Sequence, residues 1–274
     1  MRITLDFHVE TELPVNASSL LPSKVLPLSL HDIERLSVDI GNARVALHDC
    51  CHVTCEADAT DELVFGGGTG NLVNVGSKMD GSRLVVHGDV GRCAGVEMRS
   101  GELVVSGNAG DYLGAALQNG VIRVAGNAGH HCGAGLPGHK EGMAGGMIFV
   151  AGNAGCETGA AMRRGLLVIG GDSGDYTAAN LRAGTIIVAG ACGKNAGLGM
   201  RRGSLAAGKM DEPMLVGFSS SGPADIEWLR IYRNKLGEWG VLLPQGWMNG
   251  CWQRFTGDRL SLGKGEVLVH ERIE

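Results

Sequence analysis

Short alternations of apolar and polar residues return every 19 residues along the chain from Ser82 onward. The copies of this repeat begin at Ser82, Gly101, Gly120, Gly146, Gly165, Gly184 and, incompletely, Gly203. Their consensus, G-x-[LI]-x-V-x-G-[ND]-x-G-x-x-x-G-x-x-[ML]-x-x, is clearest in residues 101–119, GELVVSGNAGDYLGAALQN. The copy at 120–145 is 26 residues long, which places a seven-residue insertion within Pro137–Gly145.

Each column of the repeat predicts a structural role. Apolar pairs such as Leu103 and Val105 alternate with other residues, which is typical of a short strand with one buried face. The same pairs recur as Ile122 and Val124, Ile148 and Val150, Leu167 and Ile169, and Ile186 and Val188. A further inward column is predicted from Met98, Leu117, Leu136, Met162, Leu181 and Met200. Glycines at three offsets, as in Gly107, Gly110 and Gly114, fit corners that need positive φ or close backbone approach.

An asparagine column follows the second glycine of each copy. Its members are Asp89, Asn108, Asn127, Asn153 and Asp172, then Ala191. Stacked side chains of this kind hydrogen-bond along a stack or satisfy their own turn, so we expect a structural role for them.

A 19-residue unit cannot bury its apolar face alone, whereas stacked copies can. The fold class predicted is therefore all-β, a right-handed parallel β-helix of about six to seven coils. Leucine-rich repeats fit poorly because their Leu-Asn/Cys signature and helical segment are missing. The left-handed hexapeptide helix is the closer competitor, but three six-residue steps do not match this period or its glycine spacing.

The two ends of the chain lack the repeat, and we expect them to cap it because terminal coils otherwise expose strand edges and core. Residues 1–60 are predicted as an N-terminal cap with a short helix around His31 to Leu36. Residues 61–208 form the β-helix, with 61–80 as a degenerate first coil. Residues 209–274 form a C-terminal cap, in which residues 224–240 space Trp228, Ile231, Tyr232 and Trp239 as on a helix. That helix would seal the end of the solenoid or dock on a partner.

Composition narrows the class of protein. Glycine supplies 46 of 274 residues, well above the share of about 7% in an average protein. The hydrophobic content of 44% nevertheless argues against disorder. Collagen is excluded because glycine does not recur at every third position. No apolar run reaches the roughly 18 residues of a membrane span, and the N-terminus is charged and alternating, so we expect a cytoplasmic protein without membrane contact. A net charge of −5 argues against nucleic acid as partner.

Two clusters of candidate chemistry stand out, and neither predicts a site. His48-Asp49-Cys50-Cys51-His52 with Cys55 has no second ligand pair elsewhere, and in a strand half of these side chains face opposite ways. We therefore expect semi-buried residues and no bound metal there. His130-His131-Cys132 has no orienting carboxylate or oxyanion donor to support a nucleophile, so no catalytic residue is nominated.

An arginine column is the stronger candidate for binding. Arg99, Arg163, Arg164, Arg182, Arg201 and Arg202 all fall in the last two positions of their copies. Stacked about 4.8 Å apart, unit charges repel by roughly 0.9 kcal/mol per pair even in water. These residues are predicted to contact an acidic surface of another subunit or an acidic ligand chain. The alternative is that they extend into solvent and are screened by salt.

The chain also resembles known families. Its glycine-rich coils resemble the β-helical domain at the C-terminus of the large glutamate synthase subunit. It is more similar to the C-type subunit of the formylmethanofuran dehydrogenase family, over the run LPSKVLPLSLHDIERLSVDIGNARVALHD with its Gly41-Asn42 motif, the coils, and the closing RFTGDRLSLGKGEVLV (254–269). The likeness is strongest to the formyltransferase/hydrolase complex of methylotrophic bacteria.

The resemblance implies a scaffold subunit of a one-carbon complex that moves a formyl group from formyl-tetrahydromethanopterin to a methanofuran analogue and releases formate. The resemblance also implies that this chain binds no cofactor and that the transferase and a metal-dependent hydrolase are other subunits. The glutamate-bearing tail of the methanofuran-type carrier is then a candidate ligand of the arginine column. The corresponding C-type subunit of a tungsten or molybdenum formylmethanofuran dehydrogenase is the alternative. A stand-alone β-helix enzyme acting on a glycan is the alternative of another class, although all four tryptophans lie outside the repeat.

Overall fold

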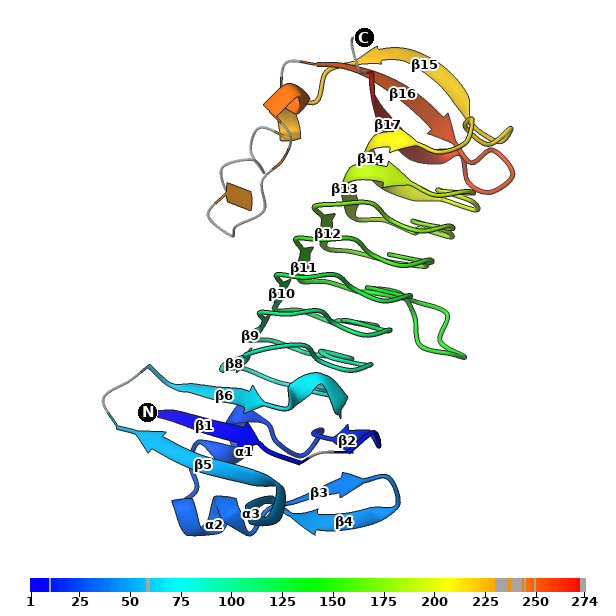
Figure 1. Cartoon of the computed structure of the whole chain (residues 1–274). Coiled ribbons are helices and arrows are strands. Elements are labelled where there is room, and N and C mark those ends of the chain that lie inside the picture. The colour runs from blue at the N-terminus through cyan, green and yellow to red at the C-terminus, as the bar shows by residue number, and fades with distance from the viewer. Residues whose placement is uncertain are drawn as a thin grey trace.

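The computed structural model consists mostly of β-strands, with a few short helices near the N-terminus (Figure 1). It describes residues 1–9, 11–57, 60–229, 236–237, 243, 245–248 and 250–271. A 13-stranded, mostly parallel sheet has the order β15-β16-β17-β14-β13-β12-β11-β10-β9-β8-β6-β1-β5. Its strands are β1 (Arg2–Phe7), β5 (Cys51–Glu56), β6 (Glu62–Gly67), β8 (Arg83–Val86), β9 (Glu102–Val105), β10 (Val121–Val124), β11 (Met147–Val150), β12 (Leu166–Ile169), β13 (Thr185–Cys192), β14 (Arg202–Met210), β15 (Ser219–Ala224), β16 (Cys251–Gly257) and β17 (Lys264–Glu271).

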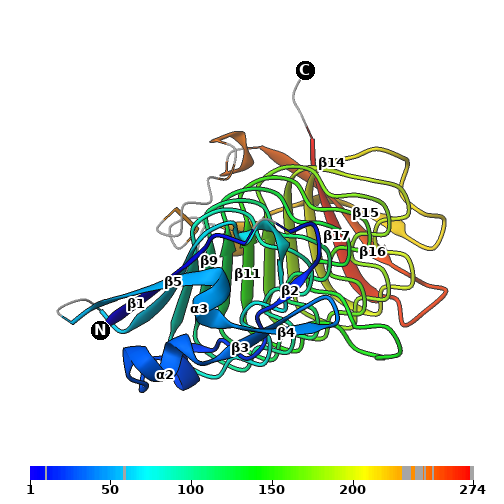
Figure 2. The ribbon, with the colours of Figure 1, turned by 60° about the horizontal axis from the view of Figure 1, so that its bottom comes forward.

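The predicted repeats follow one another along this sheet, one strand to a repeat. Strand β9 pairs in parallel with β10 so that Leu103 lies opposite Ile122, a separation of 19 residues. Strands β11, β12 and β13 continue the same register. Figure 2, with the N-terminal end brought forward, shows the successive turns of the chain stacked behind one another. The pairs that alternation predicted to face inward, such as Leu103 and Val105, are buried, as predicted.

A second row of contacts runs beside the strands and confirms the structural role of the asparagine column. Isolated parallel bridges join Val90, Ala109, Ala128, Ala154, Ser173 and Cys192 in turn. The asparagine column lies one residue before these bridges. In each case the side-chain oxygen of a column member accepts the backbone N–H of the equivalent residue in the next repeat. The Asn127 N–H, for example, donates to Asn108 Oδ1 at 2.9 Å, and the Asn153 N–H donates to Asn127 Oδ1 at 2.8 Å. These side chains supply the hydrogen bonds that a regular strand would otherwise make.

The glycine columns divide between the two roles predicted for them. Gly114 has a φ of +58°, whereas Gly110 has no positive φ, and a Cβ on it would lie 2.8 Å from the backbone nitrogen of Arg92 in the preceding repeat. Gly110 is therefore required by the close approach of stacked backbones. Several positive-φ corners carry other residues, among them Tyr112 at 61° and His131 at 60°.

The inward column differs from the prediction at one position. Met143 is fully buried in this column, whereas Leu136 is only half-buried. The Arg163 N–H donates to the Met143 carbonyl at 2.8 Å, just as the Gln118 N–H donates to that of Met98 at 2.9 Å. The sequence assigned Leu136 because the position of the insertion within the long repeat was open. The seven extra residues are 135–141, so the insertion begins before Pro137, where the sequence had placed its start.

The outer face of the large sheet changes character along the stack. At the N-terminal end it carries alternating charges, and Arg83 is 3.3 Å from Glu62 and 3.4 Å from Glu102. From β11 onward it is largely apolar, with Phe149, Leu166, Val168, Ile187, Ala206 and Leu268 in a second hydrophobic cluster, while Thr185, Ser204 and Glu266 on the same face are half-buried. The described residues that cover this face come from the C-terminal segment: Ile226, Leu229, Leu236, Trp247 and Trp252. Strands β11–β14 are therefore enclosed on both faces, which suits a parallel sheet.

That covering segment includes part of the helix predicted over 224–240. Ile226 and Leu229 are buried against the outer face of the sheet, and Trp228 packs beside them, away from the end of the stack. Ile231, Tyr232 and Trp239, on which the helical spacing also depended, lie outside the described residues.

Strands from the two ends of the chain continue the stack in register. β1 pairs in parallel with β6, and β17 pairs in parallel with β14, where Leu205 lies opposite Val267. Strand β6, which lies within residues 61–80, pairs in parallel with β8 and links this end to the first repeat. A four-stranded sheet, in the order β4-β3-β2-β7, flanks this end. Its strands are β2 (Val15–Asn16), β3 (Ser37–Ile40), β4 (Ala43–Ala46) and β7 (Leu72–Val73).

The N-terminal helices are short. They are α1 (Pro22–Val25), α2 (Leu30–Glu34) and α3 (Leu47–Cys50), with 3₁₀ turns η1 (Thr69–Asn71) and, in the C-terminal segment, η2 (Gln245–Met248). The α2 helix confirms the helix predicted around His31 to Leu36, and Ser29 caps it by accepting the Asp32 N–H. None of the helices in the described ranges is long and apolar enough to cross a membrane.

Candidate functional site

The arginine column forms a strip on the second half of the stack. We define the arginine strip as Arg163, Arg164, Arg182, Arg201 and Arg202. Its backbone is held repeat by repeat, because the N–H groups of Arg163, Arg182 and Arg201 donate to the carbonyls of Met143, Met162 and Leu181 at 2.8, 2.9 and 2.8 Å. These backbone hydrogen bonds fix where each arginine leaves the surface.

The insertion supplies an acidic partner for two members of the strip. Arg163 Nη1 is 3.1 Å from Glu141 Oε2, and Arg182 Nη1 is 2.8 Å from Glu141 Oε1. The Arg182 Nη2 group also donates to the Lys140 carbonyl at 3.1 Å. Glu141 thus bridges two stacked repeats and offsets the repulsion between their guanidinium groups. The sequence predicted an acidic partner from another subunit or a ligand chain, and an acidic partner within the chain itself was not foreseen.

The remaining three arginines of the strip stay open to solvent. Arg164, Arg201 and Arg202 are exposed, and none of them has an ion pair or side-chain hydrogen bond with another described residue. Lys264, which pairs with Arg202 across β14 and β17, extends the strip by one more cation. Arg99 is exposed but lies apart from the strip, because Gln118 and Ala144 occupy its position in the two intervening repeats.

The His130-His131-Cys132 cluster is divided among structural contacts. His130 Nδ1 accepts the Cys156 N–H at 3.0 Å, so this ring replaces a carboxylate in a second side-chain ladder. His131 stacks on Tyr112 with ring centroids 4.6 Å apart and lies 3.5 Å from Glu157. Cys132 is fully buried, and burial raises the pKa of its thiol to about 12. Such a thiol is protonated at neutral pH and does not act as a nucleophile.

The cluster from His48 to Cys55 is also divided, between α3 and β5. Cys50 and Cys51 are buried, and burial raises the pKa of both thiols. His52 faces the other way and stacks on His8 with ring centroids 4.6 Å apart, while Cys55 is exposed. Across the ranges that the structure describes, no three His, Cys, Asp or Glu side chains converge as metal ligands would.

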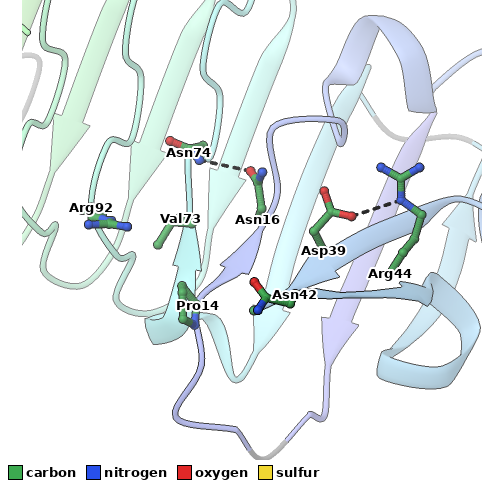
Figure 3. Close-up of a pocket in the computed structure, with 9 residues that line it drawn as sticks. Pro14, Asn16, Asp39, Asn42, Arg44, Val73, Asn74 and Arg92 are labelled. Carbon is green, nitrogen blue, oxygen red and sulfur yellow. Dashed lines mark hydrogen bonds and ion pairs between the residues drawn. The ribbon is translucent and has the colours of Figure 1, made fainter.

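A polar hollow of about 660 Å³ lies between the small sheet and the first repeats (Figure 3). Its lining is Pro14, Asn16, Asp39, Gly41, Asn42, Arg44, Val73, Asn74 and Arg92. Arg44 Nε is 3.0 Å from Asp39 Oδ1, and Asn74 Nδ2 donates to Asn16 Oδ1 at 3.1 Å. The Gly41-Asn42 motif turns the chain at the rim of this hollow. Apart from that motif, no sequence pattern indicates the hollow, because its walls come from four separate stretches.

These features suit binding at a surface. The strip offers exposed guanidinium groups on a rigid backbone, and guanidinium forks recognise carboxylates and phosphates. The asparagine, aspartate and histidine side chains of the repeat columns are engaged in hydrogen bonds that hold the stack together.

The fold and these surfaces define a glycine-rich protein of stacked parallel strands. No protein-family model matches the chain, and no curated protein matches its sequence. Among solved structures, it is similar to a chain of the formyltransferase/hydrolase complex (FhcABCD) from Methylorubrum extorquens, whose crystal structure was determined in complex with methylofuran. The identity is 33%, the alignment covers 98% of this chain and 100% of that chain, and the TM-score is 0.88. The protein belongs to the family of that chain of the formyltransferase/hydrolase complex.

Proposed function

We propose that the chain is the C-type subunit of a formyltransferase/hydrolase complex, in which it is a scaffold that holds catalytic subunits together. In this proposal residues 61–208 form a right-handed parallel β-helix, and residues 1–60 and 209–274 are its caps. The complex moves a formyl group from formyl-tetrahydromethanopterin to a methanofuran analogue and releases formate, with the transferase and the metal-dependent hydrolase in other subunits.

The observation that carries the proposal is similarity over the full length of a chain of such a complex. A likeness restricted to the repeats would follow from glycine spacing alone, but the alignment includes both ends of the chain, where the repeat is absent. The buried, protonated Cys132 and the His130 ring that serves as an acceptor further support a structural use of the residues best suited to chemistry.

The arginine strip is the proposed contact for an acidic partner. Arg164, Arg201 and Arg202 are exposed and can meet carboxylates of another subunit or the glutamate-bearing tail of the carrier, while Glu141 already serves Arg163 and Arg182. The methylofuran bound in the related complex is a carrier of the class proposed here.

Native co-purification tests the scaffold assignment. We expect the tagged full-length chain, expressed in its source organism, to bring the other subunits and formyl-transfer activity with it, and no tungsten or molybdenum. The chain purified alone should neither transfer formyl groups nor release formate nor cleave glycans. Activity of the isolated chain would overturn the scaffold role, and tungsten or molybdenum in the complex would indicate the dehydrogenase instead.

Charge removal tests the strip. The variant Arg164→Gln/Arg201→Gln/Arg202→Gln should weaken association of the complex about tenfold or more and reduce its dependence on salt. The matched control is Lys24→Gln/Arg35→Gln/Lys78→Gln, which removes three exposed cations from the N-terminal part of the chain. Equal affinity and equal salt dependence in both variants and the wild type would rule out the strip as a contact.

A further inference from the structure

The loop between β16 and β17 exposes apolar side chains to solvent. Leu260 is 87% exposed and Leu262 is 48% exposed, within residues 258–263. The adjoining segment after β14 exposes Val216 completely, and the last repeat exposes Leu198 by 40%. Four large apolar side chains are therefore presented at the C-terminal end of the stack, where the loop lies beside the segment that follows β14 (Figure 1).

A buried carboxylate holds this loop in shape. Asp258 is only 2% exposed, and its Oδ1 accepts the Leu260 N–H at 2.9 Å while its Oδ2 accepts the Gly199 N–H at 3.2 Å. Its backbone carbonyl accepts the N–H groups of Ser261 and Gly263 at 3.0 and 2.9 Å. The exposure of the two leucines is therefore built into an ordered turn, and a preorganised surface loses little entropy on binding.

The same contacts join the four apolar side chains into one surface. The Asp258 N–H donates to the Met200 carbonyl at 3.2 Å, two residues after the exposed Leu198. The Arg259 N–H donates to the Gly217 carbonyl at 2.9 Å, next to the exposed Val216. An added Cβ at Gly217 would collide with the Asp258 carboxylate, so this position also lets the two segments approach.

Cations lie beside this apolar surface, on the loop and at the end of the arginine strip. Arg201, Arg202, Arg259 and Lys264 are exposed, and within the described ranges none of them has an ion pair. The Lys264 N–H donates to the Arg201 carbonyl at 3.2 Å, which fixes the loop to the end of the arginine strip. Asp258, the acidic residue of the loop, is buried and engaged with backbone N–H groups. On the side of the loop and the arginine strip the edge of this surface is therefore positively charged, whereas the segment after β14 carries exposed Asp211 and Glu212, of which Glu212 lies 3.4 Å from Lys194.

We propose that this surface, the Asp258 loop with Leu198 and Val216, docks another subunit whose contact face is apolar at its centre and rimmed by aspartate and glutamate. The proposal rests on the proposed function and adds where and by what chemistry a partner binds. An apolar centre with a complementary charged rim is the usual arrangement of a stable interface. A symmetric contact with a second copy would instead bring four cations against four cations, which disfavours self-association through this face.

Photo-crosslinking tests which chain occupies the surface. Leu260 is replaced by benzoylphenylalanine in the tagged full-length chain, the assembled complex is irradiated, and the linked peptide is sequenced by mass spectrometry. We expect a peptide from another subunit of the active complex with aspartate or glutamate near the link. A link to a second copy of this chain, or no link, overturns the proposal.

Two variants measure the contribution of the surface. Leu260→Ser/Leu262→Ser should weaken subunit association about tenfold, and Arg259→Glu/Lys264→Glu should weaken it most at low salt. The control is Leu13→Ser/Leu30→Ser, which changes two exposed leucines, 54% and 46% exposed, at the other end of the molecule. If the wild type assembles and both variants assemble as well as the control, this inference fails while the proposed function stands. If the wild type itself recovers no complex, the proposed function fails.

Discussion

At the scale of single residues, the cysteines differ sharply in their surroundings. Cys50, Cys51, Cys132 and Cys192 are buried, whereas Cys55 and Cys251 are exposed. A thiol reagent such as Ellman's reagent should therefore react with Cys55 and Cys251 first in the native protein. The four buried thiols should react only after denaturation. Peptide mapping after a timed reaction checks this order, and early labelling of Cys132 would contradict the burial described.

Alkaline pH should lower the free energy of unfolding, because the buried thiols ionise less readily than the same thiols in the unfolded chain. Burial raises the pKa of Cys132 and of Cys192 from 9.0 to about 12. Because the unfolded thiol ionises near pH 9 and the folded one does not, the stability that each contributes is present below pH 9 and is lost as pH rises toward 12. The free energy of unfolding should fall by about 1.4 kcal/mol per pH unit for each thiol in that range.

Denaturant titrations from pH 8 to pH 11 provide the measurement. Cys132→Ala/Cys192→Ala should lose this part of the slope. Cys55→Ala/Cys251→Ala, which replaces two exposed cysteines, is the matched control. The same slope in all three proteins would mean that the buried thiols ionise freely.

At the scale of one repeat, backbone proximity sets the tolerance for a single methyl group. Gly110→Ala should be destabilised by about 3 kcal/mol or more, because its Cβ would lie 2.8 Å from backbone atoms of Gly91 and Arg92 that cannot move alone. Gly70→Ala is the control, since nothing lies within 4 Å of its Cβ and its φ is ordinary. Thermal unfolding of the two variants checks the difference, and equal melting temperatures would contradict the close stacking.

The same scale separates what the sequence predicts from what it does not. Alternation identifies the strands because Leu103 and Val105 face one core, and the 19-residue period gives their register. The ion pair between Glu141 and Arg182 joins residues 41 positions apart, and no local sequence pattern predicts such a pair. The sequence predicted one buried face for the strand Leu166–Ile169, whereas the structure buries both, the second beneath side chains such as Leu229. The hollow beside Asn74 likewise depends on four distant stretches.

At the scale of the whole molecule, pairing is complete in the middle of the sheet and incomplete at its margins. Strands β9 to β12 have partners on both sides, whereas β15, β5 and β4 are edge strands. Amide hydrogen exchange should be slowest in β10 and β11 and fastest in β15 and β4. Mass spectrometry of peptides after timed exchange checks this gradient. One common rate for all strands would instead mean that the molecule opens as a single unit.

The seven extra residues 135–141 make one copy of the repeat longer than the other copies. Copies 19 residues long have their glycines and asparagines in equivalent places, so during folding one copy has little to distinguish it from the next. A strand displaced by one whole copy would keep most of its side-chain ladders. It would separate Glu141 from Arg163 and Arg182, and would leave the seven extra residues in the wrong gap. The insertion therefore makes the correct alignment of the repeats more stable than an alignment in which a strand is displaced by one copy.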